Sequence, residues 1–148
     1  MNLRDELAQI NTIFIDTAPF IYYIEAHSLF GPLVREVINA LESEKLRGYS
    51  SVITLVEVLP KPVQEKRKAL AREFIQFLRR GKNLALMEIS ADIAEEAGKL
   101  RGKYPHLKTL DAIQISTALN IGVDAFLTND NKLRRIKDIK VIILSDYL

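Results

Sequence analysis

The sequence predicts an α/β fold, a three-layer sandwich in which helices cover both faces of a central parallel sheet of four to five strands. Three observations favour this fold. Short apolar runs rich in β-branched and aromatic residues recur along the 148 residues, as in strands buried on both faces. Longer segments with apolar residues at helical spacing separate these runs. Strand and helix therefore alternate, and parallel neighbours in a sheet need such helical crossovers.

The composition fits a single domain over residues 1–148 and excludes several kinds of site. The chain is long enough to bury a core without disulfides, and its 48% hydrophobic and 27% charged residues are ordinary for a globular protein. The absence of cysteine excludes thiolate nucleophiles and sulfur-ligated zinc. His27 and His106 lie far apart without ligand spacing, so we expect both in loops or on the surface.

The amino terminus carries charged residues where a signal peptide would need an apolar core. No apolar run approaches the length that spans a bilayer. We therefore expect a cytoplasmic protein without a membrane partner.

The first third of the chain predicts one strand and two helices after a short leading segment. Residues 3–10 predict a short helix or an ordered tail. The apolar run over residues 13–15 predicts the first strand, which stops abruptly at Asp16. A proline then begins a helix over residues 20–25. A second, longer amphipathic helix begins at a Gly-Pro pair and ends near Gly48.

The middle of the chain predicts a second strand over residues 49–53 and further helix. Thr54 and Glu57 have the spacing of a capping box, so we expect a helix to begin around Thr54. A proline interrupts this helix, which resumes over residues 63–80 with apolar residues on one face and basic residues on the other. Gly81 is expected to end it.

The remaining elements follow the same alternation. The pattern predicts three strands, over residues 84–89, 123–128 and 141–144. It also predicts a helix over residues 91–101 and another that opens near Thr109 and is stopped by Gly122.

Four acidic residues occupy strand-to-helix junctions of this predicted sheet. Asp16 ends the first strand, Glu57 lies in the first turn after the second strand, and Asp130 follows the fourth strand. Asp111 opens a crossover helix, whose amino end lies at the same edge because the helix runs antiparallel to its strands. All four are therefore expected at the carboxyl edge of the sheet, where open α/β sheets bind ligands. Asp124 and Asp146 are expected elsewhere, at the opposite edge and on the surface.

Each acid also has a local explanation. Asp16 could cap the helix after it, Glu57 could complete a capping box, Asp111 could complement a helix dipole, and Asp130 could be a turn residue. No lysine or arginine lies directly beside any of them, although closely packed carboxylates destabilise a fold unless a cation neutralises them.

A site built only from oxygen ligands favours Mg²⁺ or Mn²⁺ over zinc. Such an ion recruits phosphate, so the four acids predict metal-dependent phosphodiester hydrolysis. Thr17 and Thr128 flank the acids and could hydrogen-bond to them, or could serve only local packing at the strand ends.

Charge is unevenly distributed in the chain. Residues 61–82 contain eight basic and two acidic residues and so carry +6, while the rest of the chain carries −4 within a total of +2. Such a basic helical face could track an RNA backbone, could meet an acidic protein partner, or could simply be solvated. The candidate nucleic-acid-binding residues on it are Lys66, Arg67, Arg72, Arg79 and Arg80.

Together the acid motifs resemble those of the PIN-domain nucleases, and the size is similar to that of the VapC-type toxins of toxin–antitoxin pairs. The motifs are IFIDT around Asp16, TLVEV around Glu57, LDAIQ around Asp111 and FLTND ending at Asp130. The resemblance implies a five-stranded parallel sheet and a Mg²⁺ or Mn²⁺ site that cleaves single-stranded RNA. It further implies a homodimer and binding of an antitoxin protein.

The leading hypothesis assigns Asp16 and Asp111 to a principal metal ion, which Asp130 would complete or share. Glu57 would ligate a second ion or orient the attacking water.

One departure from the family pattern leaves an alternative open. The family commonly has serine or asparagine two residues after the first aspartate, where this chain has Ala18. The alternative is a catalytically weak module that binds RNA or a protein through the basic helix over residues 63–80. A third possibility, an aspartyl-phosphate phosphatase of the haloacid dehalogenase type, needs a second aspartate at position 18 and is disfavoured by the alanine.

Overall fold

The computed structural model describes residues 1–148 and contains one five-stranded sheet, in which every pair of neighbouring strands is parallel. The strand order is β3-β2-β1-β4-β5. The strands are β1 (Thr12–Ile15), β2 (Arg47–Ser51), β3 (Leu84–Met87), β4 (Ala125–Thr128) and β5 (Val141–Ile143). The predicted α/β class and parallel sheet are confirmed.

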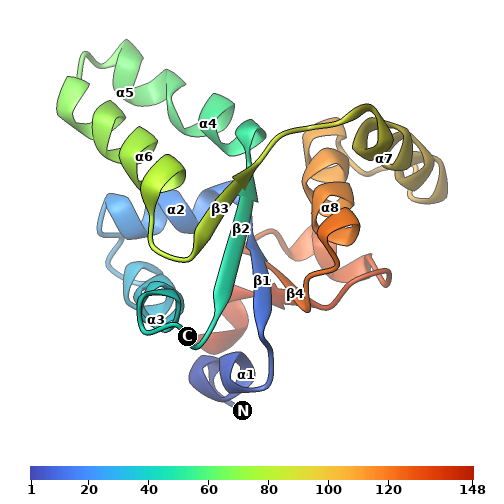
Figure 1. The fold of residues 1–148 in the computed structure, drawn as a ribbon, viewed down its shortest axis with the longest axis horizontal. Coiled ribbons are helices and arrows are strands. Elements are labelled where there is room, and N and C mark those ends of the chain that lie inside the picture. The colour runs from blue at the N-terminus through green and yellow to red at the C-terminus, as the bar shows by residue number, and fades with distance from the viewer.

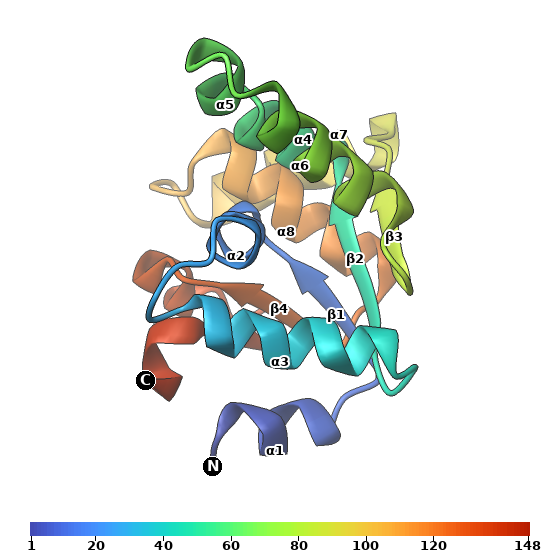
Figure 2. The ribbon, with the colours of Figure 1, turned by 90° about the vertical axis from the view of Figure 1, so that its left-hand side faces the viewer.

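Helices cover both faces of the sheet (Figures 1 and 2). One group comprises α1 (Leu3–Ala8), α2 (Thr17–Ile24), α3 (Gly31–Glu42), α4 (Val52–Val58), α5 (Pro60–Gln64) and α6 (Lys68–Arg80). The other comprises α7 (Ala91–Lys103), α8 (Thr109–Ile121) and the 3₁₀ helix η1 (Asn131–Arg135). The 3₁₀ helix η2 (Leu144–Tyr147) packs with the first group through Leu144. None of these helices is long and apolar enough to cross a membrane.

Alternation along the central strands separates the interior into two apolar cores. Ile13 and Ile15 of β1 and Leu127 of β4 contribute to the core under α2, α3 and α6. Phe14 and Phe126 point to the opposite face, where their rings stack with centroids 5.4 Å apart beneath α7 and α8. The central strands are thus buried on both sides, which explains their uninterrupted apolar sequences.

The order of the strands creates one reversal of direction. From β1 the chain winds through β2 to β3 on one side, and then returns to place β4 and β5 on the other side. The reversal therefore falls between β1 and β4, which pair in parallel with Phe14 opposite Phe126. In open α/β sheets the crevice at such a point, outside the carboxyl ends of the strands, is the usual ligand site.

The second predicted helix was too long. Helix α3 ends at Glu42, because Glu44 adopts a positive φ of 64° that turns the chain out of the helix. Gly48 is part of β2, which begins at Arg47 rather than at residue 49. A Cβ atom on Gly48 would lie 3.0 Å from the Leu41 side chain, so glycine permits the close packing of α3 on the sheet.

The middle helices also differ from their predicted bounds. Ser51, not Thr54, caps α4 by accepting a hydrogen bond from the backbone N–H of Ile53, and Thr54 is buried inside the helix. The single helix predicted over residues 63–80 is wrong, because Lys66 has a φ of 58° and separates α5 from α6.

Candidate active site

Asp16 leaves β1 at the reversal point and is held by both neighbouring elements. Its backbone N–H donates to the carbonyl of Leu127 in β4 at 2.9 Å, which continues the sheet by one residue. Its side chain caps α2, since Oδ1 accepts from the backbone N–H of Thr17 at 2.9 Å, and Oδ2 accepts from the Thr128 hydroxyl at 2.8 Å. The predicted capping role of Asp16 is confirmed, although α2 begins at Thr17 and not beyond Pro19.

The carboxyl group of Asp16 is also electrostatically strained. Burial raises its pKa from 3.8 to about 6, and the negative charges of Asp111 and Glu57 act in the same direction. The hydrogen bonds from Thr17 and Thr128 oppose this shift by stabilising the carboxylate. Asp16 therefore lies near two acids from distant parts of the chain, which a role as a helix cap alone does not require.

Asp111 lies in the first turn of α8, and no group of the protein donates a hydrogen bond to its side chain. Burial raises the pKa of Asp111, followed by the charges of Asp130 and Glu57. The ammonium groups of Lys108 and Lys132 lower this pKa, so two cations lie near the acids without forming an ion pair with them. Neither lysine is directly adjacent to an acid in sequence, which is why sequence inspection missed them.

Glu57 projects from the exposed side of α4. The capping box predicted from its spacing to Thr54 is wrong, because Thr54 is inside the helix and Ser51 caps it. Instead, Glu57 Oε1 accepts a hydrogen bond from the Thr17 hydroxyl at 2.6 Å, and its Oε2 has no partner in the protein. Thr17 therefore links two of the acids, because its hydroxyl donates to Glu57 and its backbone N–H donates to Asp16.

A buried polar network lies behind Thr17. It consists of the side chains of Ser50, Ser51, Thr54 and Gln114. Gln114 Nε2 donates to Thr54 Oγ1 at 2.9 Å, and Ser51 Oγ donates to Gln114 Oε1. Sequence reasoning missed these residues; the available signal was a glutamine, Gln114, among the apolar residues of a buried helix.

Each hydroxyl group has one hydrogen to donate, and this limit fixes which groups are donors in the network. The only hydroxyl hydrogen of Ser50 goes to the carbonyl of Ile15 at 3.0 Å, and that of Thr17 goes to Glu57. Thr54 Oγ1 lies 3.0 Å from Ser50 Oγ and 3.3 Å from Thr17 Oγ1, so Thr54 must be the donor in either contact. When Thr54 donates to Thr17, a continuous chain of donors runs from Gln114 to Glu57, and such chains strengthen each bond.

Asp130 follows β4 and begins η1. Its Oδ1 accepts from the backbone N–H of Lys132 at 2.9 Å, and its own N–H donates to the Thr128 hydroxyl at 3.2 Å, so Thr128 connects Asp130 to Asp16. The predicted role as a turn residue describes part of its geometry, because it caps a 3₁₀ helix. Its Oδ2 has no partner in the protein.

The oxygen donors fit a hard cation that keeps part of its water. No group of three or more acidic or histidine side chains is arranged to hold a metal ion directly. Mg²⁺ does not require such a cage, since it commonly binds through one or two carboxylates, several waters and a substrate phosphate. Glu57, Asp111 and Asp130 each keep at least one oxygen without a hydrogen bond. Each oxygen of Asp16 accepts one hydrogen bond and keeps a second lone pair that could ligate an ion.

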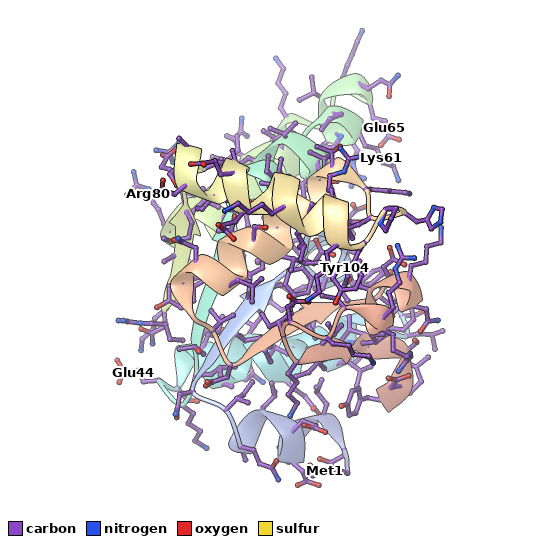
Figure 3. The ribbon with its side chains drawn as sticks, turned by 90° about the vertical axis from the view of Figure 1, so that its right-hand side faces the viewer. Met1, Glu44, Lys61, Glu65, Arg80 and Tyr104 are labelled. Atoms are coloured by element: carbon purple, nitrogen blue, oxygen red, sulfur yellow. The ribbon has the colours of Figure 1, made fainter.

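The remaining predicted residues lie outside this edge. Asp124 accepts hydrogen bonds from the backbone N–H groups of Asn11 and Thr12, where β1 begins. Asp146 forms an exposed ion pair with Arg134. The basic residues predicted to bind RNA are all exposed, but they are spread over the length of α6 and the turn before it: Lys66, Arg67, Arg72, Arg79 and Arg80. Figure 3 shows Arg80 and Glu65 at opposite ends of this region.

His27 and His106 occupy exposed positions, as the sequence suggested. The His27 ring accepts hydrogen bonds from the backbone N–H groups of Leu29 and Phe30, which is a structural role in the turn before α3.

Comparison with known proteins gives one family and a set of structural relatives. The model of the PIN domain family matches residues 13–139. A chain of a toxin–antitoxin complex from Klebsiella pneumoniae has a TM-score of 0.65 at 26% identity, over 89% of this chain and 97% of that chain. No curated protein matches the sequence.

Two further structures share the fold at lower identity. VapBC2 from Rickettsia felis, solved with a DNA fragment of its promoter, gives a TM-score of 0.68 at 20% identity over 89% of this chain and 98% of that chain. VapC20 from Mycobacterium tuberculosis, described as a toxin that cleaves the sarcin–ricin loop, gives 0.65 at 15% identity over 86% and 98%. At these identities the likeness shows the fold alone.

Proposed function

The chain belongs to the PIN domain family, and we propose that it is a Mg²⁺- or Mn²⁺-dependent endoribonuclease that hydrolyses phosphodiester bonds of single-stranded RNA. The observation that carries this proposal is the shared electrostatic field of acids from separate elements. Glu57 and Asp111 both raise the pKa of Asp16, and Asp130 and Glu57 both raise that of Asp111. A divalent cation would relieve this repulsion, and an RNA phosphate would bring that cation a further ligand.

In the proposed reaction, water adds across one P–O bond of the RNA. The water oxygen forms a bond to phosphorus while the bond to the leaving ribose oxygen breaks, and the water proton ultimately passes to that oxygen. A bound divalent ion would lower the pKa of the attacking water and stabilise the negative charge on the phosphate oxygens. Asp16 and Asp111 are proposed as the principal ligands, Asp130 as a further or shared ligand, and Glu57 as a second ligand or the group that orients the water.

The positions of the supporting residues agree with this division of roles. Thr17 donates to Glu57, and Thr128 donates to Asp16, so each acid is held in one orientation before an ion or substrate arrives. The absence of a side-chain hydroxyl at Ala18 removes one further polar group, but it leaves these two bonds intact.

The test is cleavage of a labelled single-stranded RNA by the parent chain and by Asp16→Asn, with Mg²⁺ or Mn²⁺ and with a chelator. Asn retains a side-chain acceptor for the α2 cap, so the variant should stay folded and lose cleavage. Asp92→Asn, at an exposed position of α7, is the matched control and should cleave like the parent. Metal-independent cleavage, or an unchanged rate in Asp16→Asn, would remove the proposal. RNA binding without any cleavage by the parent would favour the binding module instead.

We further propose that the chain is the toxin of a toxin–antitoxin pair and forms a homodimer. The structural relatives named above include chains solved in toxin–antitoxin complexes. Exposed apolar side chains support a protein partner: Val56 on α4 is 65% exposed and Val63 on α5 is 64% exposed. Sedimentation of the purified chain, alone and with the product of a neighbouring reading frame, tests both assemblies. Inhibition of RNA cleavage by that product is the expected functional result.

A further inference from the structure

A cavity of about 220 Å³ opens beside Asp111 and Asp130, between the segment that leads into α8 and the 3₁₀ helix η1. Apart from these two acids, most of its polar lining is basic. Lys108 lies at the start of α8, Lys132 and Arg135 lie on η1, and His106 completes that side. The volume equals roughly seven water molecules, which leaves room for a phosphate group beside a hydrated ion.

The basic residues on this cavity differ from other basic residues of the same region in having no partner. Arg134 makes a two-bond ion pair with Asp146, and Lys140 pairs with Glu6 at 2.7 Å. By contrast, the side chains of Lys108, Lys132 and Arg135 make no hydrogen bond and no ion pair, although they line the same cavity as Asp111 and Asp130.

The three basic side chains lie close to the acids but do not pair with them. Lys108 and Lys132 line the same cavity as Asp111 and Asp130. Neither forms a direct ion pair that would occupy a carboxylate oxygen needed by a metal ion. Three unpaired cations at the mouth of an acidic site suit a ligand that is itself anionic and approaches the acids.

We propose that Lys108, Lys132 and Arg135 bind the backbone phosphates of single-stranded RNA next to the cleaved bond, so that the strand enters the acidic site along α8 and η1. This inference rests on the proposed ribonuclease function and specifies which surface holds the substrate. It places the main RNA-binding surface beside α8 and η1 and not at the carboxyl-terminal end of α6, where Arg79 and Arg80 lie.

The course of α6 supports this choice. Arg79 and Arg80 lie in the last turn of α6, directly before the turn that leads into the start of β3. The start of a parallel strand lies at the edge opposite the acids, and the 13 residues of α6 span about 20 Å. A phosphate bound at Arg79 or Arg80 would therefore be far from the bond to be cut.

The test measures binding of a fluorescent single-stranded RNA to the full chain carrying Asp16→Asn, so that the RNA is not cut. One variant adds Lys108→Gln, Lys132→Gln and Arg135→Gln; the charge-matched control adds Arg72→Gln, Arg79→Gln and Arg80→Gln. For single strands each lost phosphate contact lowers the slope of log affinity against log salt by about 0.7, so we expect a decrease of about 2 in the first variant and no change in the control.

In the otherwise unchanged chain, the same three substitutions should raise KM for RNA more than they lower kcat, because they remove binding and not the acids. The variant should stay folded, since none of the three side chains makes a hydrogen bond or an ion pair. Its melting temperature should fall only slightly, because Lys108 and Lys132 offset part of the negative charge near Asp111. An unchanged salt slope in the first variant, or an equal decrease in the α6 control, overturns the inference while leaving the proposed ribonuclease function standing. Absence of RNA cleavage by the parent removes the proposed function, and the inference falls with it.

Discussion

At the scale of single residues, Asp16 combines a structural and a proposed chemical role in one carboxyl group. One oxygen caps α2 and the other accepts from Thr128, yet its pKa is raised to about 6 by burial and by Asp111 and Glu57. Two hydrogen bonds are therefore not enough to offset burial next to two other acids. The folded state prefers the protonated form of Asp16 over a range where the unfolded chain is already ionised.

This preference predicts how stability depends on pH without metal. Between about pH 4 and 6, Asp16 binds more protons in the folded state than in the unfolded state, so its contribution to the free energy of unfolding should fall as pH rises, by up to about 3 kcal/mol. Asp16→Asn should flatten this fall and should be at least as stable as the parent at pH 7. Urea unfolding at several pH values measures both effects. A marked loss of stability in Asp16→Asn would mean that its capping role dominates.

Asp124 provides a control with the opposite sign. Hydrogen bonds from the backbone of Asn11 and Thr12 lower the pKa of Asp124, so its contribution is present at neutral pH and is lost in acid. Asp124→Asn should therefore retain the fall in stability between about pH 4 and 6.

The hydroxyl of Thr54 offers a second prediction at this scale. Thr54→Val keeps the shape of the side chain but removes its hydroxyl. The Gln114 amide then lacks its acceptor, and Thr17 lacks the only side-chain donor that can reach it. We expect a loss of about 1–3 kcal/mol in the free energy of unfolding. Because Thr17 then holds Glu57 less firmly, we expect cleavage to fall roughly 10–100-fold. Thr54→Ser restores the hydroxyl and should recover activity. Equal activities of the valine and serine variants would show that the network is purely structural.

At the scale of elements, the ends of α4 and α8 position three of the acids. Ser51 begins α4 immediately after β2, which brings Glu57 within reach of Thr17. Helix α8 begins at Thr109, so Asp111 is in its first turn, and Gly122 ends the helix with a left-handed φ of 83°. The turn at Gly122 then leads into β4, and Asp130 follows the carboxyl end of that strand.

Gly122→Ala should test this turn separately from the site. Alanine at a φ of 83° is strained by about 1–2 kcal/mol, although a Cβ atom there would meet nothing within 4 Å. We therefore expect a lower melting temperature with unchanged RNA cleavage below it. Gly102→Ala, on the exposed side of α7 with equally free space, is the matched control and should not lower the melting temperature.

At the scale of the whole molecule, the sheet gathers acids from along most of the chain at one edge, and the unfolded chain has no such arrangement. A divalent ion should therefore bind the folded state preferentially and stabilise it. Saturating Mn²⁺ or Mg²⁺ should raise the melting temperature at pH 7.5. The rise should be smaller at pH 5, where protons compete with the ion for Asp16.

The matched controls for this prediction are Asp111→Asn, in which the rise should be largely lost, and Asp92→Asn, in which it should persist. A rise of equal size in Asp111→Asn would place the ion away from the proposed ligands. Without metal, Asp111→Asn should be as stable as the parent or more stable, because it relieves repulsion and no hydrogen bond is lost.

The sequence alone determined the alternation of strand and helix and the positions of Asp16, Asp111 and Asp130 at strand and helix ends. These features are local, since period and end residues are written in short stretches such as residues 13–16. Glu57 lies in the last turn of α4 and not in the first turn predicted for it. Helix bounds were less accurate where packing overruled local signals: Gly48 reads as a helix stop but fits beneath Leu41 in a strand, and Thr54 reads as a cap but is buried.

Only the tertiary structure decided which distant residues meet. The pairing of β1 with β4 and the contact of Gln114 with Thr54 join residues far apart in the chain. Arg134 pairs with Asp146 while its neighbour Arg135 stays unpaired, because the two side chains leave η1 in different directions. The physical reason is that burial and electrostatic fields sum over neighbours in space. The raised pKa of Asp16 exists only once folding brings Asp111 and Glu57 to the end of β1.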